Sequence, residues 1–434
     1  MKFHTLFVCG TLLSAALAHA RAPEQRTTDT HVGSTRTADV HVGPARLTPS
    51  WLSRLRTEAA AAHPASAASR ERAKANAAET RSIYLWEDPM VGLSLMPADR
   101  MMRRSEGDIS LMIEQPLPKP GVYEASRSKA AAMHRYGVQQ SRATSLASGS
   151  AAARTAIELA LADEAISLQA LQLEWLREMT ENARQRALDP DATSMESLRL
   201  QSELTRETEM LHAARRTRAS LAQKLNLELG RSVNAPWPEL RLPEKSLPVP
   251  IASSEIARIS AKSPRILAMK AMADAAHEET RMADRERQPG FAITTGTNLY
   301  SGGDFRSAEI GVKLNLPWFN DRSYRAKVDA ARHQEKAAEA DVATMTREIK
   351  AEVLTVVAEI ANAAAQADAY SGDIHTRSRL ASESAQSSWL SGGAPLNELL
   401  EARRMLFSVR LDQRRFIAMQ LAALEELNLL VPRP

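Results

Sequence analysis

Residues 290–320 read GFAITTGTNLYSGGDFRSAEIGVKLNLPWFN, and two runs in this stretch alternate apolar with polar side chains. The first run has one face made of Phe291, Ile293, Thr295, Thr297 and Leu299. After a turn at 301–304, the second run sets Ile310, Val312, Leu314 and Leu316 against Glu309, Gly311, Lys313 and Asn315. Alternation with a period of two is typical of strands, so the stretch is predicted to be a β-hairpin.

A second hairpin is predicted at residues 90–115. Its first run alternates Val91, Leu93 and Leu95 with Gly92, Ser94 and Met96. After a polar turn, its second run alternates Ile109, Leu111 and Ile113 with Ser110, Met112 and Glu114. Each run has about ten residues, the length that a tilted strand needs to cross a bilayer.

The two hairpins belong to an internal duplication. Pro116 corresponds to Pro317, at a separation of 201 residues, the difference between the two numbers. The same offset relates Tyr123 to Tyr324, Ala125 to Ala326, Ser194 to Pro395 and Leu198 to Leu399. Agreement of hairpins, helix breaks and single residues at one offset indicates two copies of one structural unit.

Long helices are predicted to follow each hairpin. The stretch 123–188 contains no proline and would be roughly 100 Å long as one helix, and 324–390 matches it in the second half. Shorter helices are predicted at 48–83, with an interruption near Pro64, and at 193–229, 254–287 and 396–430. An aromatic content of only 4% and only 17 glycines favour helices packed side by side.

We therefore expect a mainly α fold with a small β part. The predicted segments are a signal peptide at 1–20, a flexible N-terminal segment at 21–46, a first repeat at 47–235, a Pro-rich linker at 236–253 and a second repeat at 254–434. The only cysteine, Cys9, lies within the signal, where lipidation is the less favoured alternative to cleavage after Ala20. Two histidines in the 21–46 segment suit a linker better than a weak metal site.

The predicted strands need partners from other chains. Two hairpins are marginal in water by themselves, and open edges are not tolerated in lipid. Three copies related by rotational symmetry would close a twelve-stranded barrel with an open lumen. A soluble sandwich and a plain coiled coil are the alternatives. The net charge is only +4, and acidic and basic residues are interspersed at helical spacings. This pattern favours a solvated helix surface over a nucleic-acid-binding surface.

Three motifs resemble the TolC-type outer-membrane efflux family, and more narrowly its heavy-metal branch. They are Glu87-Asp88-Pro89-Met90, Gln115-Pro116-Leu117-Pro118-Lys119-Pro120-Gly121 and Leu316-Pro317-Trp318-Phe319-Asn320. The resemblance extends over nearly all of the chain past residue 47. It implies a homotrimer in the outer membrane, a β-barrel surrounded by lipid and a helical tunnel in the periplasm. It also implies two protein partners, a periplasmic adaptor and an inner-membrane pump of the resistance-nodulation-division type.

The resemblance also implies functional positions at the ends of the long helices. The adaptor-contacting tips correspond to Asp189, Pro190, Asp191, Ser194, Gly392, Gly393, Ala394 and Pro395. The segment that narrows the tunnel matches residues 396–402, where Glu398 and Glu401 share one helical face and would form acidic rings in a trimer. The alternative is a solvated helix face on which these glutamates pair with Arg403 or Arg404.

Aromatic side chains near the strand ends suit the interface between membrane and water, although simple packing explains any one of them equally well. They are Trp86, Tyr123, Phe291, Tyr300, Trp318 and Phe319.

The sequence contains no glycine-rich phosphate loop, nucleophile elbow or His-x-x-x-His pair, so we expect neither an enzyme nor a bound cofactor. The favoured function is the exit duct of an efflux system with heavy-metal cations as cargo. Drug efflux, protein secretion and a periplasmic structural coiled coil are the alternatives.

Overall fold

The computed structural model describes residues 45–96, 108–187, 195–248, 261–300 and 303–431. These residues belong to one compact unit, 43–434. The expected signal peptide and nearly all of the 21–46 segment lie outside the described residues. Among the described helices, none has the length and apolar character that crossing a membrane requires.

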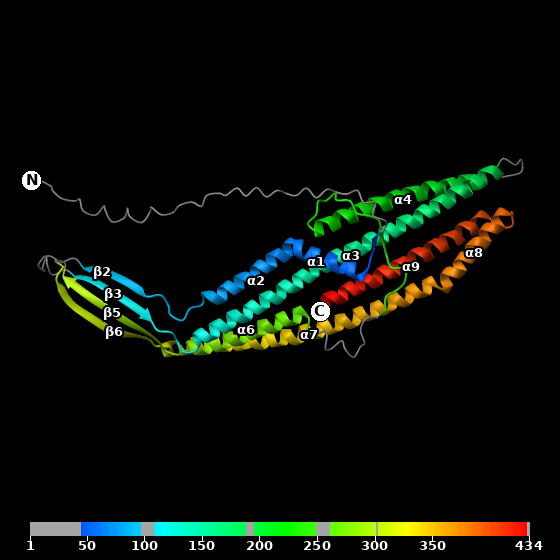
Figure 1. The fold of residues 1–434 in the computed structure, drawn as a ribbon. Helices are drawn as coiled ribbons and strands as arrows, with labels where there is room; N and C mark the ends of the chain where they lie inside the picture. The colour runs from blue at the N-terminus through cyan, green and yellow to red at the C-terminus, as the bar shows by residue number, and fades with distance from the viewer. Residues whose placement is uncertain (1–44, 97–107, 188–194, 249–260, 301–302, 432–434) are drawn as a thin grey trace, which may run out of the picture. The chain divides into compact units, whose positions relative to one another are not determined.

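Four antiparallel strands form one sheet (Figure 1). They are β2 (Met90–Met96), β3 (Asp108–Pro116), β5 (Gly290–Tyr300) and β6 (Phe305–Asn315), in the order β2-β3-β5-β6. Val91 pairs with Ile113, Ile113 with Thr295 and Thr295 with Ile310. The predicted apolar faces of the four strands therefore lie on the same side of the sheet.

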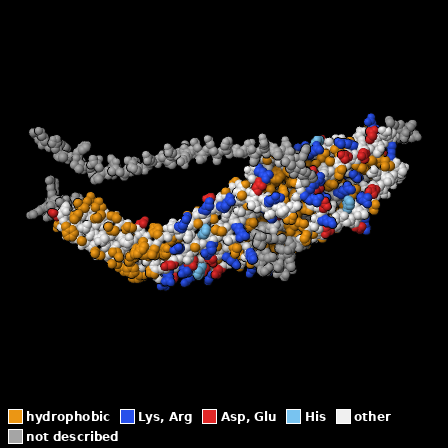
Figure 2. All heavy atoms as spheres, in the orientation of Figure 1, with side chains coloured by type: hydrophobic (Ala, Val, Ile, Leu, Met, Phe, Trp, Pro, Cys, Tyr) orange, Lys and Arg blue, Asp and Glu red, His pale blue; other side chains and the backbone are white. Residues whose placement is uncertain are grey.

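The two faces of the sheet differ sharply in polarity. Many apolar side chains on one face are exposed: Val91, Leu93, Leu95, Leu111, Ile113, Phe291, Ile293, Ile310, Val312 and Leu314. The opposite face carries ion pairs between strands, from Lys313 to Glu114 and from Arg306 to Asp108. In Figure 2 hydrophobic side chains gather over the strands, whereas charged side chains cover the helices. An exposed apolar area of this extent marks a surface that contacts lipid or protein.

Strands β2 and β6 are the edges of the sheet. Three successive antiparallel pairings separate them, so they run in opposite directions. An edge strand presents unpaired backbone N–H and C=O groups. Because of their directions, β6 of one copy can pair antiparallel with β2 of the next.

The helices of the first half pack around one long helix, α3 (Val122–Arg186). Its 65 residues give a length of about 98 Å. Helices α1 (Pro49–Ala62), α2 (Pro64–Ser82) and α4 (Met195–Glu228) contact it. The break between α1 and α2 falls at Pro64, as predicted, because proline cannot continue a helix hydrogen-bond pattern.

The helices of the second half are α6 (Pro264–Glu286), α7 (Asp321–Ser371), α8 (Asp373–Leu390) and α9 (Leu396–Leu430), with a 3-10 turn at Pro317–Asn320. The prediction of one uninterrupted helix over 324–390 is wrong, since Gly372 separates α7 from α8 with φ −93° and ψ −113°. Glycine has the lowest helix propensity after proline. At the equivalent place in the first half, Leu171 lies within the unbroken α3.

A short parallel ladder joins segments that were predicted to be a flexible tail and a linker. β1 (Ala45–Arg46) pairs with β4 (Leu240–Arg241). Leu47, Leu240 and Leu242 are buried in a core shared with α1, α3, α4 and α9. The last two residues of the predicted tail, the following Leu47 and part of the Pro-rich segment are thus packed against the helices.

Two glycines let α1 and α2 approach α3 closely. A Cβ on Gly149 would lie 2.9 Å from the carbonyl oxygen of Arg56 in α1, and one on Gly137 would lie 2.7 Å from Nδ2 of Asn76 in α2. Real Cβ atoms do not approach backbone oxygens so closely, so α1 must shift to admit a methyl group at residue 149.

We expect Gly149→Ala to destabilise the protein by about 1–3 kcal/mol, the usual cost of overpacking. This loss would occur although alanine is the better helix former. Thermal unfolding of the detergent-solubilised protein, followed by circular dichroism, measures it. Ala151→Ser, at an exposed position of the same helix, should leave the melting temperature unchanged. Equal melting temperatures for Gly149→Ala and the wild type would show that the helices do not touch as described.

Candidate functional site

The turn between α8 and α9 is one of the two expected tips. Gly392 has φ +78°, and a Cβ built on it would meet nothing within 4 Å. The N–H of Gly392 donates to the carbonyl of Trp389 and that of Gly393 to the carbonyl of Ser388. A glycine in the left-handed conformation ends α8, and Pro395 precedes α9. The other tip residues, Asp189, Pro190, Asp191 and Ser194, lie outside the described residues.

Glu398 and Glu401 project from the exposed side of the first turns of α9. The other side of these turns is buried through Leu396, Leu399 and Leu400. In the part of the chain that the structure describes, neither glutamate takes part in an ion pair. The structure therefore brings the two carboxylates together on one solvent-facing side of a helix.

The neighbouring arginines are bound to other partners. Arg404 pairs with Glu203 of α4 at 2.5 Å. Arg403 donates to Oε1 of Gln172 at 2.9 Å and stacks over the Trp175 ring at 4.7 Å. Burial, and secondarily the charge of Arg410, lowers the pKa of Arg403 from its ordinary value. Within one chain, the alternative that Arg403 or Arg404 neutralises the glutamates therefore finds no support.

Arg186 ties the end of α3 to the end of α8. It donates to the carbonyls of Trp389 at 2.9 Å and Leu390 at 2.6 Å, and it lies 4.4 Å above the ring of the buried Trp389. A helix leaves its last carbonyls without partners inside the helix, and a guanidinium satisfies them well. This contact positions the end of α8, next to the exposed turn at 391–395. It spans more than 200 residues of sequence, so no local pattern predicts it.

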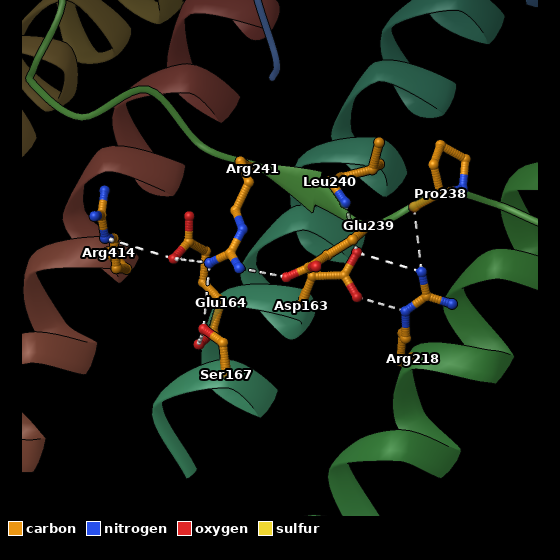
Figure 3. A network of polar contacts seen from close by, with 9 residues as sticks. All are labelled: Asp163, Glu164, Ser167, Arg218, Pro238, Glu239, Leu240, Arg241 and Arg414. Atoms are coloured by element: carbon orange, nitrogen blue, oxygen red, sulfur yellow. Dashed lines mark hydrogen bonds and ion pairs between the residues drawn. The ribbon is translucent and has the colours of Figure 1, made fainter. Parts of the chain in front are cut away.

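A buried polar network lies farther along α3 (Figure 3). Asp163 accepts hydrogen bonds from Nε of Arg218 in α4 at 2.5 Å and from the backbone N–H of Leu240 at 2.9 Å. Arg218 also donates to the carbonyls of Trp237 and Pro238. Both acceptors of Asp163 are thus engaged, and α3, α4 and the 236–241 segment are held together.

Glu164, the next residue of α3, belongs to the same network. It faces Arg241 of β4 at 3.4 Å and Arg414 of α9 at 3.8 Å (Figure 3). Arg241 also pairs with Glu239, and Arg414 donates to the carbonyl of Pro243. Every carboxylate here has arginine partners, which gives the network a structural role. Among the described residues, no group of three or more His, Cys, Asp and Glu could hold a metal ion.

The expected interfacial aromatics lie at both ends of the sheet. Trp86, Phe291, Trp318 and Phe319 are exposed at the end where the helices begin, and Tyr123 is in the first turn of α3. Tyr300 pairs with Asp108 at the opposite end. Contact of these rings with a membrane interface stays a prediction.

Part of the chain matches a known protein family. Residues 256–431 match the family model "Outer membrane efflux protein". No curated protein matches the chain.

Solved structures with the same fold include the outer-membrane channel OprN, the transmembrane channel CusC and the outer membrane protein VceC. The channel OprN has a TM-score of 0.76 and 14% identity, over 87% of this chain and 89% of its own. CusC, which forms a transmembrane channel, has a TM-score of 0.76 and 15% identity, over 88% of this chain and 92% of its own. VceC from Vibrio cholerae has a TM-score of 0.74 and 15% identity, over 88% of this chain and 96% of its own. At these identities the comparison establishes the fold alone.

Proposed function

We propose that the chain, whose residues 256–431 match the outer membrane efflux protein family, belongs to that family and is the channel subunit of a tripartite efflux system. It is a passive exit duct that receives its cargo from an inner-membrane pump and a periplasmic adaptor. Membership of this family would locate the protein in the outer membrane, and the match of residues 256–431 supports that location.

The observation that carries the proposal is the four-stranded sheet with its exposed apolar face and two free edges. An exposed apolar face is unfavourable in water and favourable in lipid. The edges β2 and β6 have the opposite directions that pairing between rotated copies requires. Three copies give twelve strands, enough for an open lumen whose wall is the face carrying Lys313 and Glu114.

The helices supply the length of a duct across the periplasm. The 65 residues of α3 extend about 98 Å, far more than a globular domain needs. The exposed turn at 391–395 joins helices that run away from the sheet, so it suits contact with an adaptor. We assign adaptor contact to Gly392, Gly393, Ala394 and Pro395, together with Asp189, Pro190, Asp191 and Ser194.

Glu398 and Glu401 serve as the constriction in this proposal. In a trimer they would form two rings of carboxylates, which attract cations and repel one another. Removing the side chains widens the passage, so Glu398→Ala with Glu401→Ala is expected to raise the single-channel conductance in planar bilayers several-fold. The matched control is Glu71→Ala with Glu79→Ala, an exposed acidic pair on α2. If the conductance of the α9 variant is unchanged, Glu398 and Glu401 do not form the constriction.

Heavy-metal cations are the proposed cargo, supported by the exposed acidic pair on α9 and by the motifs shared with the heavy-metal branch. Deleting the gene should sensitise the cell to a group of metal ions, and the restored gene should reverse this. Sensitivity of the deletion strain to organic toxicants alone would support the duct function but reject heavy-metal cations as its cargo. A water-soluble protein absent from the outer membrane would instead favour a periplasmic structural coiled coil.

A further inference from the structure

Among the described residues, every half-buried arginine except Arg410 of α9 binds an oxygen acceptor. An arginine is always charged, so its removal from water favours an anionic or strongly polar partner. Arg186 donates to backbone carbonyls, and Arg403 donates to the amide oxygen of Gln172. The others pair with carboxylates: Arg56 with Glu425, Arg154 with Glu426, Arg218 with Asp163, Arg241 and Arg414 with Glu164, and Arg265 with Glu352.

The partner that the structure gives Arg410 is a nitrogen atom. Nε of Arg410 lies 3.4 Å from Nε2 of His375 in α8, which is a long contact. A guanidinium has five N–H donors, and four of them belong to its two terminal nitrogens. Within the described residues these four donors of Arg410 have no acceptor. Such a pair of nitrogens binds two oxygens of one anion in parallel.

Positive charge accumulates around Arg410. Arg403 precedes it by seven residues, which places both on one face of α9 about 10 Å apart. Burial lowers the pKa of His375, and the charges of Arg410 and Arg379 lower it further. Arg379 is neutralised by Glu383. Arg403 and Arg410 therefore remain without a carboxylate, and both attract an anion.

The acidic residues near Arg410 in α9 do not supply that anion. Glu401 precedes Arg410 by nine residues, or two and a half turns, so it leaves the opposite side of the helix. Asp412 is bound to Arg415. Glu164 of α3 is bound to Arg241 and Arg414 (Figure 3). The missing acceptor therefore comes from outside the chain.

We propose that Arg410 and Arg403, with the imidazole of His375, form a binding site for an oxyanion where α8 packs against α9. The ligand is a sulfate, phosphate or carboxylate group, since two oxygens on one atom match the terminal nitrogens of a guanidinium. Its source is a free anion or a carboxylate of a second copy of the chain. The site does not rest on the proposed duct, because its contacts lie within one chain.

His375 makes binding at this site sensitive to pH. The charged groups that act on its ring are Arg410 from α9 and Arg379 from α8. A bound oxyanion favours the imidazolium and thus raises the pKa of His375. By linkage, the anion binds more tightly as the pH falls through that pKa.

Sodium sulfate is the probe for the full-length protein in detergent, because sulfate stays doubly charged between pH 6 and pH 8. Calorimetric titration at constant ionic strength should show binding that is tighter at pH 6. Arg410→Gln should bind sulfate about tenfold or more weakly, the loss expected for a charged hydrogen-bond donor. Arg415→Gln, at an exposed position of α9, is the matched control and should bind like the wild type.

Arg410→Lys keeps the charge but loses the paired donors, so it should show an intermediate affinity, also if Arg410→Gln does not fold. Equal sulfate affinity in the wild type and the Arg410 variants would overturn the site. Equal affinity at pH 6 and pH 8 would overturn the role of His375.

Mild electrophoresis distinguishes the two sources of the anion. If the wild type binds no sulfate but the assembly of Arg410→Gln dissociates more readily than that of Arg415→Gln, a second copy supplies a carboxylate to the site. No sulfate binding together with equal stability of the two assemblies would overturn the proposal. None of these results depends on channel conductance, so the site and the duct can fail separately.

Discussion

Ile310→Lys is expected to prevent assembly of the protein in the outer membrane. Ile310 is 86% exposed in the single chain, so the same change in a water-soluble protein would alter stability by no more than about 0.5 kcal/mol. If the apolar face of the sheet contacts lipid, a lysine costs about 2–4 kcal/mol near the bilayer midplane. In the proposed trimer, each of the three chains incurs this cost. Outer-membrane fractionation followed by mild electrophoresis measures the trimer that remains.

Glu309→Lys is the matched control for this prediction. It introduces the same residue one position earlier, on the polar face of β6. A lysine that faces a water-filled lumen should be tolerated, so this variant is expected to assemble. Normal assembly of Ile310→Lys would contradict the assignment of the apolar face to lipid.

Asp163→Ala should cost about 3–5 kcal/mol of stability, the usual penalty for removing one partner of a buried ion pair. The change leaves Arg218 without its carboxylate and the N–H of Leu240 without its acceptor. The contact between α3, α4 and the 236–241 segment should then loosen. A lower melting temperature and faster proteolysis within the 236–248 segment are the expected results.

The control for Asp163→Ala is Glu158→Ala. Glu158 also joins α3 to α4, through Lys224 at 3.9 Å, but both side chains are exposed. Exposed ion pairs contribute about 0–1 kcal/mol, so this variant should unfold close to the wild type. Equal effects of the two substitutions would mean that the network in Figure 3 does not hold the helices together.

The strands and most helix ends could be predicted because their signals are local. Alternation places Val91, Ile113 and Ile310 on one face, and the sheet register confirms this. The helix predicted over 396–430 has the same bounds in the structure, since Gly393 and Pro395 mark its start. Gly372 was missed because a single glycine within a helical pattern is usually tolerated and no proline accompanies it.

The contacts made by short segments could not be predicted from periodicity. β1 and β4 have two residues each, too few to show an alternation. A Pro-rich composition indicates a linker, and nothing local shows that Leu240 and Leu242 are buried. Only the tertiary structure brings the 236–248 segment onto α3 and α9.

The partners of charged side chains depend on distant segments. Arg404 pairs with Glu203 and Arg186 with the end of α8, across about 200 residues of sequence. For the buried network on α3, the sequence does contain one local indication. Asp163 and Glu164 follow the mainly apolar run 156–162 in α3, where adjacent acids suggest buried partners.

Electron cryo-microscopy of the protein purified from outer membranes tests the central claim most directly. The channel proposal predicts a threefold-symmetric particle in which β6 of each chain pairs antiparallel with β2 of the next, closing twelve strands around a lumen lined by Met90, Glu114 and Lys313. A particle in which β2 and β6 remain unpaired, or in which the apolar face of the sheet is turned inward, would contradict it.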